Sequence, residues 1–493
     1  MAFIRAILDI RKGELGKTAG MFAYFFIVIA AFWFLKPLRS VLVIEKLGAD
    51  SLRQLKVLTA LVSIGVVAAY SVALTRFSRE RLTYVILGAF FWLQVFFWFF
   101  FTYLGVYKTV YYGFYVFLDL FITVNMALFW TFLADITRPE SAKRLYGIIG
   151  AGGVIGGFVG SFTSNSLIER ITPADMLLYV ALAYSSIFFI VYGISRRVQS
   201  IKEVPSGTIA VAGKSRLADA LAGARVVLKS KYFLGICFVL AAYELTSTIN
   251  DFTFHKAVEM IFAEKGGTAS LLGVLLTFVD QTTGLDVTSW LEVNFGLQVA
   301  GGTLGSFFSG FYLAMNLLAL LVQVLLTSLV IRRLGMTTAL LVLPVALVAM
   351  SIGFFFFPVF LLVEFLYLTD NSLNYSLNQT SRELLFVPAG REDKYRALAF
   401  IDMFVLRAAK AMAGFLLLGL AGMATIFGST GFFSASSSSI RWYMLLTIPL
   451  GLAWIAVAVY LGRRFHGLSE SATERDMSLG TAPEDSYNVL PIE

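Results

Sequence analysis

The chain alternates long runs of apolar residues with short polar segments. A helix needs roughly 20 consecutive apolar residues to cross the hydrocarbon core of a bilayer, and the runs have about that length. They predict twelve transmembrane helices, which lie at 18–45, 54–75, 82–104, 109–135, 145–167, 174–195, 232–256, 303–331, 337–357, 359–385, 397–425 and 442–462. The pattern therefore predicts an all-α polytopic membrane protein.

Lysines and arginines gather in every second segment between these runs. The segments at 76–81, 138–144 and 391–396 are basic, whereas the segments on the other side hold few cations. The positive-inside rule then predicts that both termini are cytoplasmic and that the protein lies in the inner (cytoplasmic) membrane of the cell. In this interpretation Lys56 is a residue of an external loop.

A basic linker in the middle of the chain separates six runs from six. Two six-helix halves that start on the same side of the membrane are typical of the major facilitator architecture. The predicted division is an amphipathic cytoplasmic segment at 1–17, a first half at 18–195, the linker at 196–231, a second half at 232–465 with an external insertion at 257–302, and a cytoplasmic tail at 466–493.

The composition excludes several classes of protein. With 58% hydrophobic and 14% charged residues, the chain does not resemble a soluble domain, and the lipid bilayer is the expected surrounding. The net charge of +8 is spread over short loops, so nucleic acid is not a predicted partner. The single cysteine and two distant histidines predict no disulfide framework and no metal site. Without a P-loop or a nucleophile elbow, we expect no enzyme activity and no cofactor, and secondary transport is the default function.

Six cations remain inside the predicted helices; Lys256 and Arg382 lie close to helix ends, and the other four should lie deeper. Lys36 and Arg39 belong to the first run, and Arg407 and Lys410 to the eleventh. Each costs at least about 2.5–3.5 kcal/mol at the centre of a lipid-facing helix, so each should face a water-filled cavity or a partner. The i, i+3 spacing places each pair on one helix face, where an anion between the two charges would offset their repulsion. The alternative is that these cations form only structural salt bridges with intramembrane acids such as Asp119.

Polar residues also form stripes along two predicted helices. Asn371, Asn374 and Asn378 follow i, i+3, i+7 spacing on the tenth run, and residues 244–251 carry a similar stripe on the seventh. Such a stripe is typical of a helix that lines a water-accessible cavity. Hydrogen bonding between helices is the alternative for the asparagines.

Two local features predict backbone geometry. Pro37 should break or kink the first run beside its cation pair. The glycine-rich segment 150–156 resembles a dinucleotide-binding loop, but it lies inside an apolar run with no strand before it. Small residues that allow close helix packing explain it better.

Four motifs of the chain resemble those of the bacterial and plastid ATP/ADP translocase family, which are nucleotide transporters of the major facilitator superfamily. They lie at 35–43 (LKPLRSVLV), 132–146, 250–256 (NDFTFHK) and 399–410. The family's charged positions fall on Arg39, Asp135, Asp251 and Lys410, each with its sign kept. Arginine replaces lysine at the first position and aspartate replaces glutamate at the next two. The charge pattern at 382–395 is similar to that of the family's branch in free-living bacteria.

The resemblance implies a monomeric antiporter that exchanges ATP for ADP by alternating access around a cationic phosphate site at the membrane midplane. In the empty carrier, the two aspartates would neutralise the cations. The predicted substrate-binding residues are Lys36, Arg39, Asp135, Asp251, Asn371, Asn374, Asn378, Arg407 and Lys410. The three substituted charges leave open a carrier for another organic or phosphorylated anion. A membrane scaffold or sensor without transport activity is a third hypothesis.

Overall fold

The structure is a computed structural model, and it is helical through nearly all of the chain that it describes. The described residues are 14–76, 79–104, 107–137, 139–199, 216–298, 302–386, 388, 391–426 and 437–479. Most of the predicted amphipathic segment at 1–17, the middle of the predicted linker and the end of the predicted tail lie outside these residues.

The helices follow the apolar runs closely. In chain order they are α2 (Leu15–Leu42), α3 (Leu52–Arg76), α4 (Arg79–Tyr103), α5 (Lys108–Ile136), α6 (Pro139–Leu167), α7 (Pro173–Gln199), α8 (Arg216–Lys229), α9 (Lys231–Lys265), α10 (Leu271–Thr283), α11 (Val287–Phe295), α12 (Leu304–Leu321), α13 (Thr327–Phe356), α14 (Phe360–Leu373), α15 (Gln379–Leu385), α16 (Arg391–Phe400), α17 (Leu406–Ile426) and α18 (Met444–Leu479). Shorter π-helical turns lie at Val43–Leu47 (η1), Val322–Leu326 (η3), Asn374–Asn378 (η4) and Ile401–Val405 (η5), and 3₁₀ turns at Ala49–Ser51 (η2) and Ser437–Tyr443 (η6).

Ten helical stretches in the described part of the chain are long and apolar enough to cross a membrane, and they correspond to the first nine predicted runs and the twelfth. The tenth run is helical as α14, η4 and α15, and the eleventh as α16, η5 and α17. Each of these two runs carries charged residues and contains a π-helical turn. The prediction of an all-α polytopic membrane protein is confirmed.

The chain forms two compact units. The first comprises Met1–Gly48, Ala73–Gly213 and Phe262–Leu317, and the second comprises Ala49–Val72, Lys214–Ile261 and Leu318–Glu493. Each unit takes in one predicted run from the other half of the sequence: α3 belongs mainly to the second unit, and most of α12 to the first. The division into two continuous six-helix halves stays a prediction.

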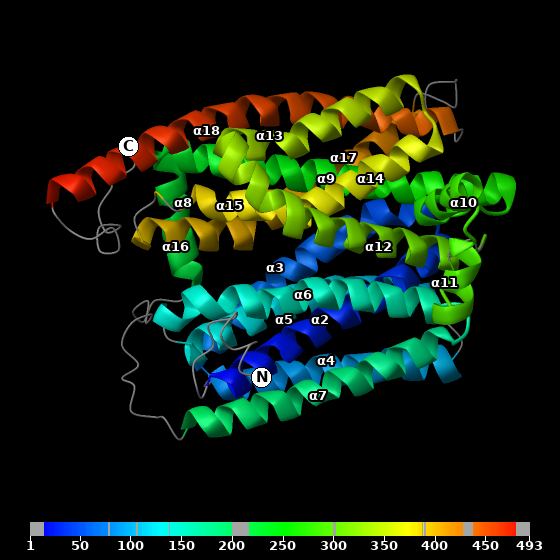
Figure 1. Cartoon of the computed structure of the whole chain (residues 1–493), viewed down its shortest axis with the longest axis horizontal. Coiled ribbons are helices and arrows are strands. Elements are labelled where there is room, and N and C mark those ends of the chain that lie inside the picture. The colour runs from blue at the N-terminus through cyan, green and yellow to red at the C-terminus, as the bar shows by residue number, and fades with distance from the viewer. Residues whose placement is uncertain are drawn as a thin grey trace. The chain divides into compact units, whose positions relative to one another are not determined.

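In the first unit, α2 packs against α5, α6 and α7 (Figure 1). Glycines bring α6 into backbone contact with α2. A Cβ atom added to Gly160 would collide with the carbonyl oxygen of Ala30, and Cβ atoms added to Gly156 and Gly152 would collide with the carbonyl oxygens of Phe26 and Phe22, one and two turns earlier in α2. Gly150 has open space around its Cβ position. The interpretation of this glycine-rich segment as a helix-packing surface is confirmed.

Pro37 does not interrupt α2, so the predicted break is wrong, and a kink at this position stays a prediction. The helix continues to Leu42 although Pro37 has no N–H to donate to Trp33. Its neighbours on both sides are buried, and tertiary packing of this kind supplies most of a helix's stability. The irregular backbone comes later, in η1, which ends at Gly48 with φ at 79°.

In the second unit, α13 packs against α14 and α18, and α8 packs against α16 (Figure 1). Aromatic side chains connect α9 to its neighbours in this unit. Phe254 stacks on Tyr367 of α14 with ring centres 4.4 Å apart, and Phe252 meets Tyr443 edge to face at 5.1 Å. These contacts position the polar face of α9 against α14.

The insertion at 257–302 contains the end of α9 and the two short helices α10 and α11. The first of these short helices ends at Gly284, whose φ of 69° is the left-handed conformation that glycine adopts without strain. The N–H of Val287 donates to the Asp280 carboxylate at 2.7 Å. The Thr288 side chain, together with the N–H groups of Val287 and Thr288, holds the pKa of Asp280 below its ordinary value. This carboxylate therefore closes the turn between α10 and α11.

Candidate functional site

The first unit holds a buried cation in an aromatic setting. Lys36 on α2 is only 5% exposed. Its Nζ atom lies 4.1 Å from the centre of the Trp33 ring and 4.6 Å from the centre of the Tyr312 ring. Both distances are within the range in which a ring face attracts a cation. The predicted intramembrane position of Lys36 therefore corresponds to a site walled by two large aromatic rings.

Polar bonds to α6 fix the α12 segment that carries Tyr312. Asn316 donates to the Ser161 hydroxyl at 2.8 Å, and Asn165 donates to the Ser309 hydroxyl at 2.8 Å. All four side chains are buried. Since α6 also touches α2, one set of contacts positions the cation and the ring that faces it. The hydroxyl of Tyr312 itself is hydrogen-bonded to Ser40 at 3.0 Å.

Arg39 lies one turn after Lys36 and forms an ion pair with Asp119 of α5. Its guanidinium carbon is 4.6 Å from the centre of the Tyr115 ring. The salt bridge that sequence reasoning offered as an alternative is therefore present at Arg39. The partner is not Asp135, whose exposed side chain lies about 24 Å further along α5 at 1.5 Å per residue.

The second unit holds a second buried ion pair, between Asp251 of α9 and Lys56 of α3. The side chains are 12% and 7% exposed. Placing Lys56 in an external loop was wrong, because α3 begins at Leu52 and buries this lysine within the helix. Removing a charged pair of this kind from water is costly unless its geometry is good and further hydrogen bonds satisfy it.

Asp251 has those further bonds. The hydroxyl of Tyr367 donates to its Oδ1 atom at 2.7 Å, and Nδ1 of His255 lies 3.5 Å from the same oxygen. The His255 ring also contacts the backbone oxygen of Asp251 at 2.8 Å. The carboxylate that the family motif singles out is thus the centre of a buried polar cluster in this unit.

Lys256 also lies on α9, and its ammonium group forms two ion pairs. Its Nζ atom is 2.9 Å from Asp50 and 2.6 Å from Glu259. Asp50 also pairs with Arg53 at 2.9 Å. These charges form a partly exposed network at the start of α3, unlike the buried pair of Lys56 and Asp251.

The asparagine stripe lies on α14 and η4. Asn371 donates to the carbonyl of Tyr367 and Asn378 donates to Oδ1 of Asn374, both at 2.9 Å. Both of these bonds stay within the same helical segment, so they do not join two helices. The side chains of Asn371 and Asn378 are buried, and Asn374 is half-buried. Their role in substrate binding stays a prediction.

Arg407 and Lys410 lie on α17 and are both half-buried. Just before them, in η5, Asp402 is 3.9 Å from Arg382. The convergence of this pair with Lys36 and Arg39 stays a prediction.

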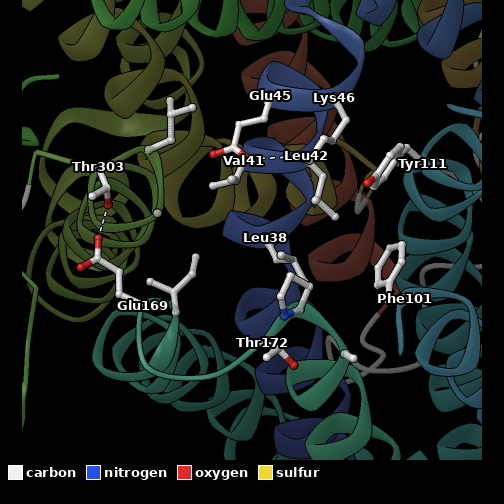
Figure 2. A pocket seen from close by; sticks show the side chains of 15 residues that line it. Leu38, Val41, Leu42, Glu45, Lys46, Phe101, Tyr111, Glu169, Thr172 and Thr303 are labelled. Atoms are coloured by element: carbon white, nitrogen blue, oxygen red, sulfur yellow. Dashed lines mark hydrogen bonds and ion pairs between the residues drawn. The ribbon is translucent and has the colours of Figure 1, made fainter. Parts of the chain in front are cut away.

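A cavity of about 540 Å³ opens near the end of α2 in the first unit (Figure 2). Leu38, Val41 and Leu42 supply much of its apolar wall, and the hydroxyl of Thr303 donates to the Glu169 carboxylate at its rim. Neither Lys36 nor Arg39 lines this cavity. It is therefore separate from the buried cation pair.

Sequence reasoning missed two of the residues that build these sites. Tyr312 is one of several aromatic residues in an apolar run, and nothing in the pattern distinguishes it. Lys56 could have been found, because it lies two residues inside the predicted run at 54–75. A lysine inside such a run carries the same free-energy cost of leaving water as Lys36 does.

Solved structures with the same fold are membrane transporters. The nucleoside transporter NupG aligns with a TM-score of 0.57 and 11% identity, covering 91% of this chain and 99% of its own. A bacterial homologue of the human lysosomal transporter Spinster gives 0.52 and 12%, covering 93% and 99%. The xylose transporter XylE from E. coli gives 0.51 and 12%, covering 90% and 95%. The chain thus has a polytopic helical fold like that of these solved structures.

The family model described as TLC ATP/ADP transporter matches residues 101–288, which include α5, α6, α7 and α9. A comparison with curated proteins finds no match. The match covers less than half of the chain, and the matched segment contains Asp135 and Asp251, the two acids of the predicted site.

Proposed function

We propose that the protein exchanges ATP for ADP across the inner membrane by alternating access, as an antiporter of the ATP/ADP translocase type found in free-living bacteria. Lys36 and Arg39 would bind the phosphate chain from one side, and Arg407 and Lys410 from the other. Asp135, Asp251 and the stripe of Asn371, Asn374 and Asn378 would complete the polar wall of the substrate cavity. The protein would act as a monomer with both termini in the cytoplasm.

The observation that carries this proposal is the burial of two cations one turn apart in a membrane-spanning helix. Lys36 and Arg39 are each 5% exposed. Holding two like charges on one buried helix face is unfavourable unless an anion joins them for part of the cycle. A chain of phosphates supplies several negative oxygens at the spacing of such a pair, and the guanidinium fork of Arg39 suits two of them at once.

The surroundings of Lys36 suit the rest of a nucleotide. Trp33 and Tyr312 present ring faces within 5 Å of the ammonium group. A purine can stack on such a face, and base–aromatic stacking contributes about 1–3 kcal/mol in other nucleotide-binding proteins. One cluster therefore offers both a phosphate contact and a stacking surface.

Asp119 would act as a stand-in for phosphate in the empty carrier. Its ion pair with Arg39 keeps a buried guanidinium compensated, and an incoming phosphate would displace it. Lys56 would compensate the buried carboxylate of Asp251 in the second unit. Two neutralised pairs would keep the empty cavity from carrying unpaired charge through the membrane.

The test is exchange by the purified protein in liposomes loaded with ADP, measured as uptake of labelled ATP. We expect Lys36→Met and Lys410→Ala to abolish uptake. Lys46→Met is the matched control, because Lys46 follows on the same segment but is about half exposed beside Glu45, and this variant should transport normally. Uptake that survives Lys36→Met and Lys410→Ala would refute the site.

Substrate identity needs a separate measurement. Thermal stabilisation by nucleotides, sugar phosphates and carboxylates should single out nucleoside di- and triphosphates. Stabilisation by a non-nucleotide anion alone would instead identify a carrier for another organic or phosphorylated anion.

A further inference from the structure

The second unit holds a buried carboxyl group that the proposed substrate site does not use. Asp370 on α14 is 0% exposed. Neither of its carboxylate oxygens makes a hydrogen bond of ordinary geometry, although Ser247 and Asn250 of α9 lie beside it. The amide oxygen and nitrogen of Asn250 are buried and likewise make no such bond. In the described part of the chain, no ion pair involves Asp370.

The charges around Asp370 are of its own sign. Glu244 and Asp251, both on α9, are the charged groups that act on it. Lys56 and His255 also lie near these acids, but both contact the carboxylate of Asp251. The segments α13 and η4 also pack against α14, and in the described residues they contribute no charged group that acts on Asp370.

An ionised carboxylate in this position would be strongly disfavoured. Moving a charge out of water without a counter-ion or hydrogen bonds costs more than protonating the group, so a buried acid becomes neutral instead. The nearby carboxylates increase that preference. Tyr367 does not relieve it, because its hydroxyl donates to Asp251.

From this geometry we propose that Asp370 is a proton-binding site that couples transport to the proton gradient. The acid carries a proton in the buried arrangement seen here. When the helices move and water reaches α9 and α14, the O–H bond breaks, the proton passes to water, and a carboxylate remains. Reprotonation from the opposite side of the membrane restores the buried, neutral acid. The seventh-run stripe at 244–251 is then the wall of a proton site.

The first test needs no substrate. Infrared spectroscopy of the purified protein at neutral pH should show the C=O band of a protonated carboxylic acid that is absent in Asp370→Asn. Because asparagine has the shape of the neutral acid, this variant should fold and melt at or above the temperature of the unmodified protein. An infrared spectrum without such a band would overturn the proposal whether or not the variant folds, since the band is sought in the unmodified protein.

The second test rests on the proposed nucleotide exchange. ADP-loaded liposomes take up labelled ATP with and without an imposed pH gradient. Each coupled proton allows up to about a tenfold change in the accumulation of labelled ATP per pH unit of the imposed gradient. We expect Asp370→Asn to keep exchange at symmetric pH but to lose this response. The control is Glu364→Gln. Glu364 is a second buried acid on α14, and this variant should keep the response to the pH gradient.

The outcomes of the two tests separate the two proposals. Loss of all uptake in the unmodified protein would contradict nucleotide exchange, and the infrared band would still decide whether Asp370 holds a proton. Uptake that ignores the pH gradient, or that follows a sodium gradient instead, would overturn proton coupling while leaving exchange intact.

Discussion

The ion pair of Lys56 and Asp251 allows a quantitative test of the second unit, because both charges are buried and each can be removed separately. At an effective dielectric constant near 20, charges about 4 Å apart attract by about 4 kcal/mol. Removing one member leaves the other buried without its counter-charge, which typically costs about 3–5 kcal/mol of the free energy of unfolding. We therefore expect Asp251→Asn and Lys56→Met each to destabilise the protein by that amount.

The two single variants should not lower the free energy of unfolding by the same amount. With Lys56 gone, Asp251 keeps its bond from Tyr367 and its contact with His255 3.5 Å away. With Asp251 neutralised, both Lys56 and His255 lose the carboxylate charge that they face. Asp251→Asn should be the more damaging change.

The double variant is the decisive measurement. Replacing both members of a buried pair is often neutral, so Lys56→Met with Asp251→Asn should recover most of the loss and be non-additive by more than about 3 kcal/mol. Equilibrium unfolding in detergent, followed by tryptophan fluorescence, measures all four proteins of the cycle. Strict additivity of the two single effects would refute a direct ion pair.

Three further predictions concern other parts of the chain. Gly160→Ala should lower the melting temperature sharply, since its Cβ would collide with backbone, whereas Gly150→Ala should leave it unchanged. Arg39→Lys should retain the charge opposite Asp119 but lose the fork, so uptake should fall mainly through a raised KM; an unchanged KM would contradict phosphate binding by the fork. The lowered pKa of Asp280 means that its stabilisation of the α10–α11 turn is complete above the ordinary aspartate value of about 3.9 and is lost as the pH falls through the lower native value. Hydrogen exchange of that turn, corrected for intrinsic rates, should therefore rise in acid, and Asp280→Asn should remove the dependence.

The positions of most helices could be predicted from the sequence because apolar runs of membrane length have few alternatives. The glycine-rich segment was also interpretable, since a helix of small residues has an obvious packing use. The partners of the buried charges were not predictable, because they depend on which helices are neighbours. Arg39 had several intramembrane acids to choose from, and its pairing with Asp119 follows from the packing of α2 against α5. Pro37 shows the opposite case, in which a strong local signal yields to tertiary packing.

The glycine contacts between α6 and α2 also have a mechanical meaning. Backbones that touch at three successive turns cannot slide past one another without collision, and Glu14 at the start of α2 is further bound to Ser141 and Arg144 of α6. We therefore expect the two helices to behave as one rigid body. Lys36 and Arg39 lie on this helix pair, so we expect them to move together with it. An anion bound to these two cations would therefore act on both helices at once. At 1.5 Å of rise per residue, the helix pair is some 40 Å long.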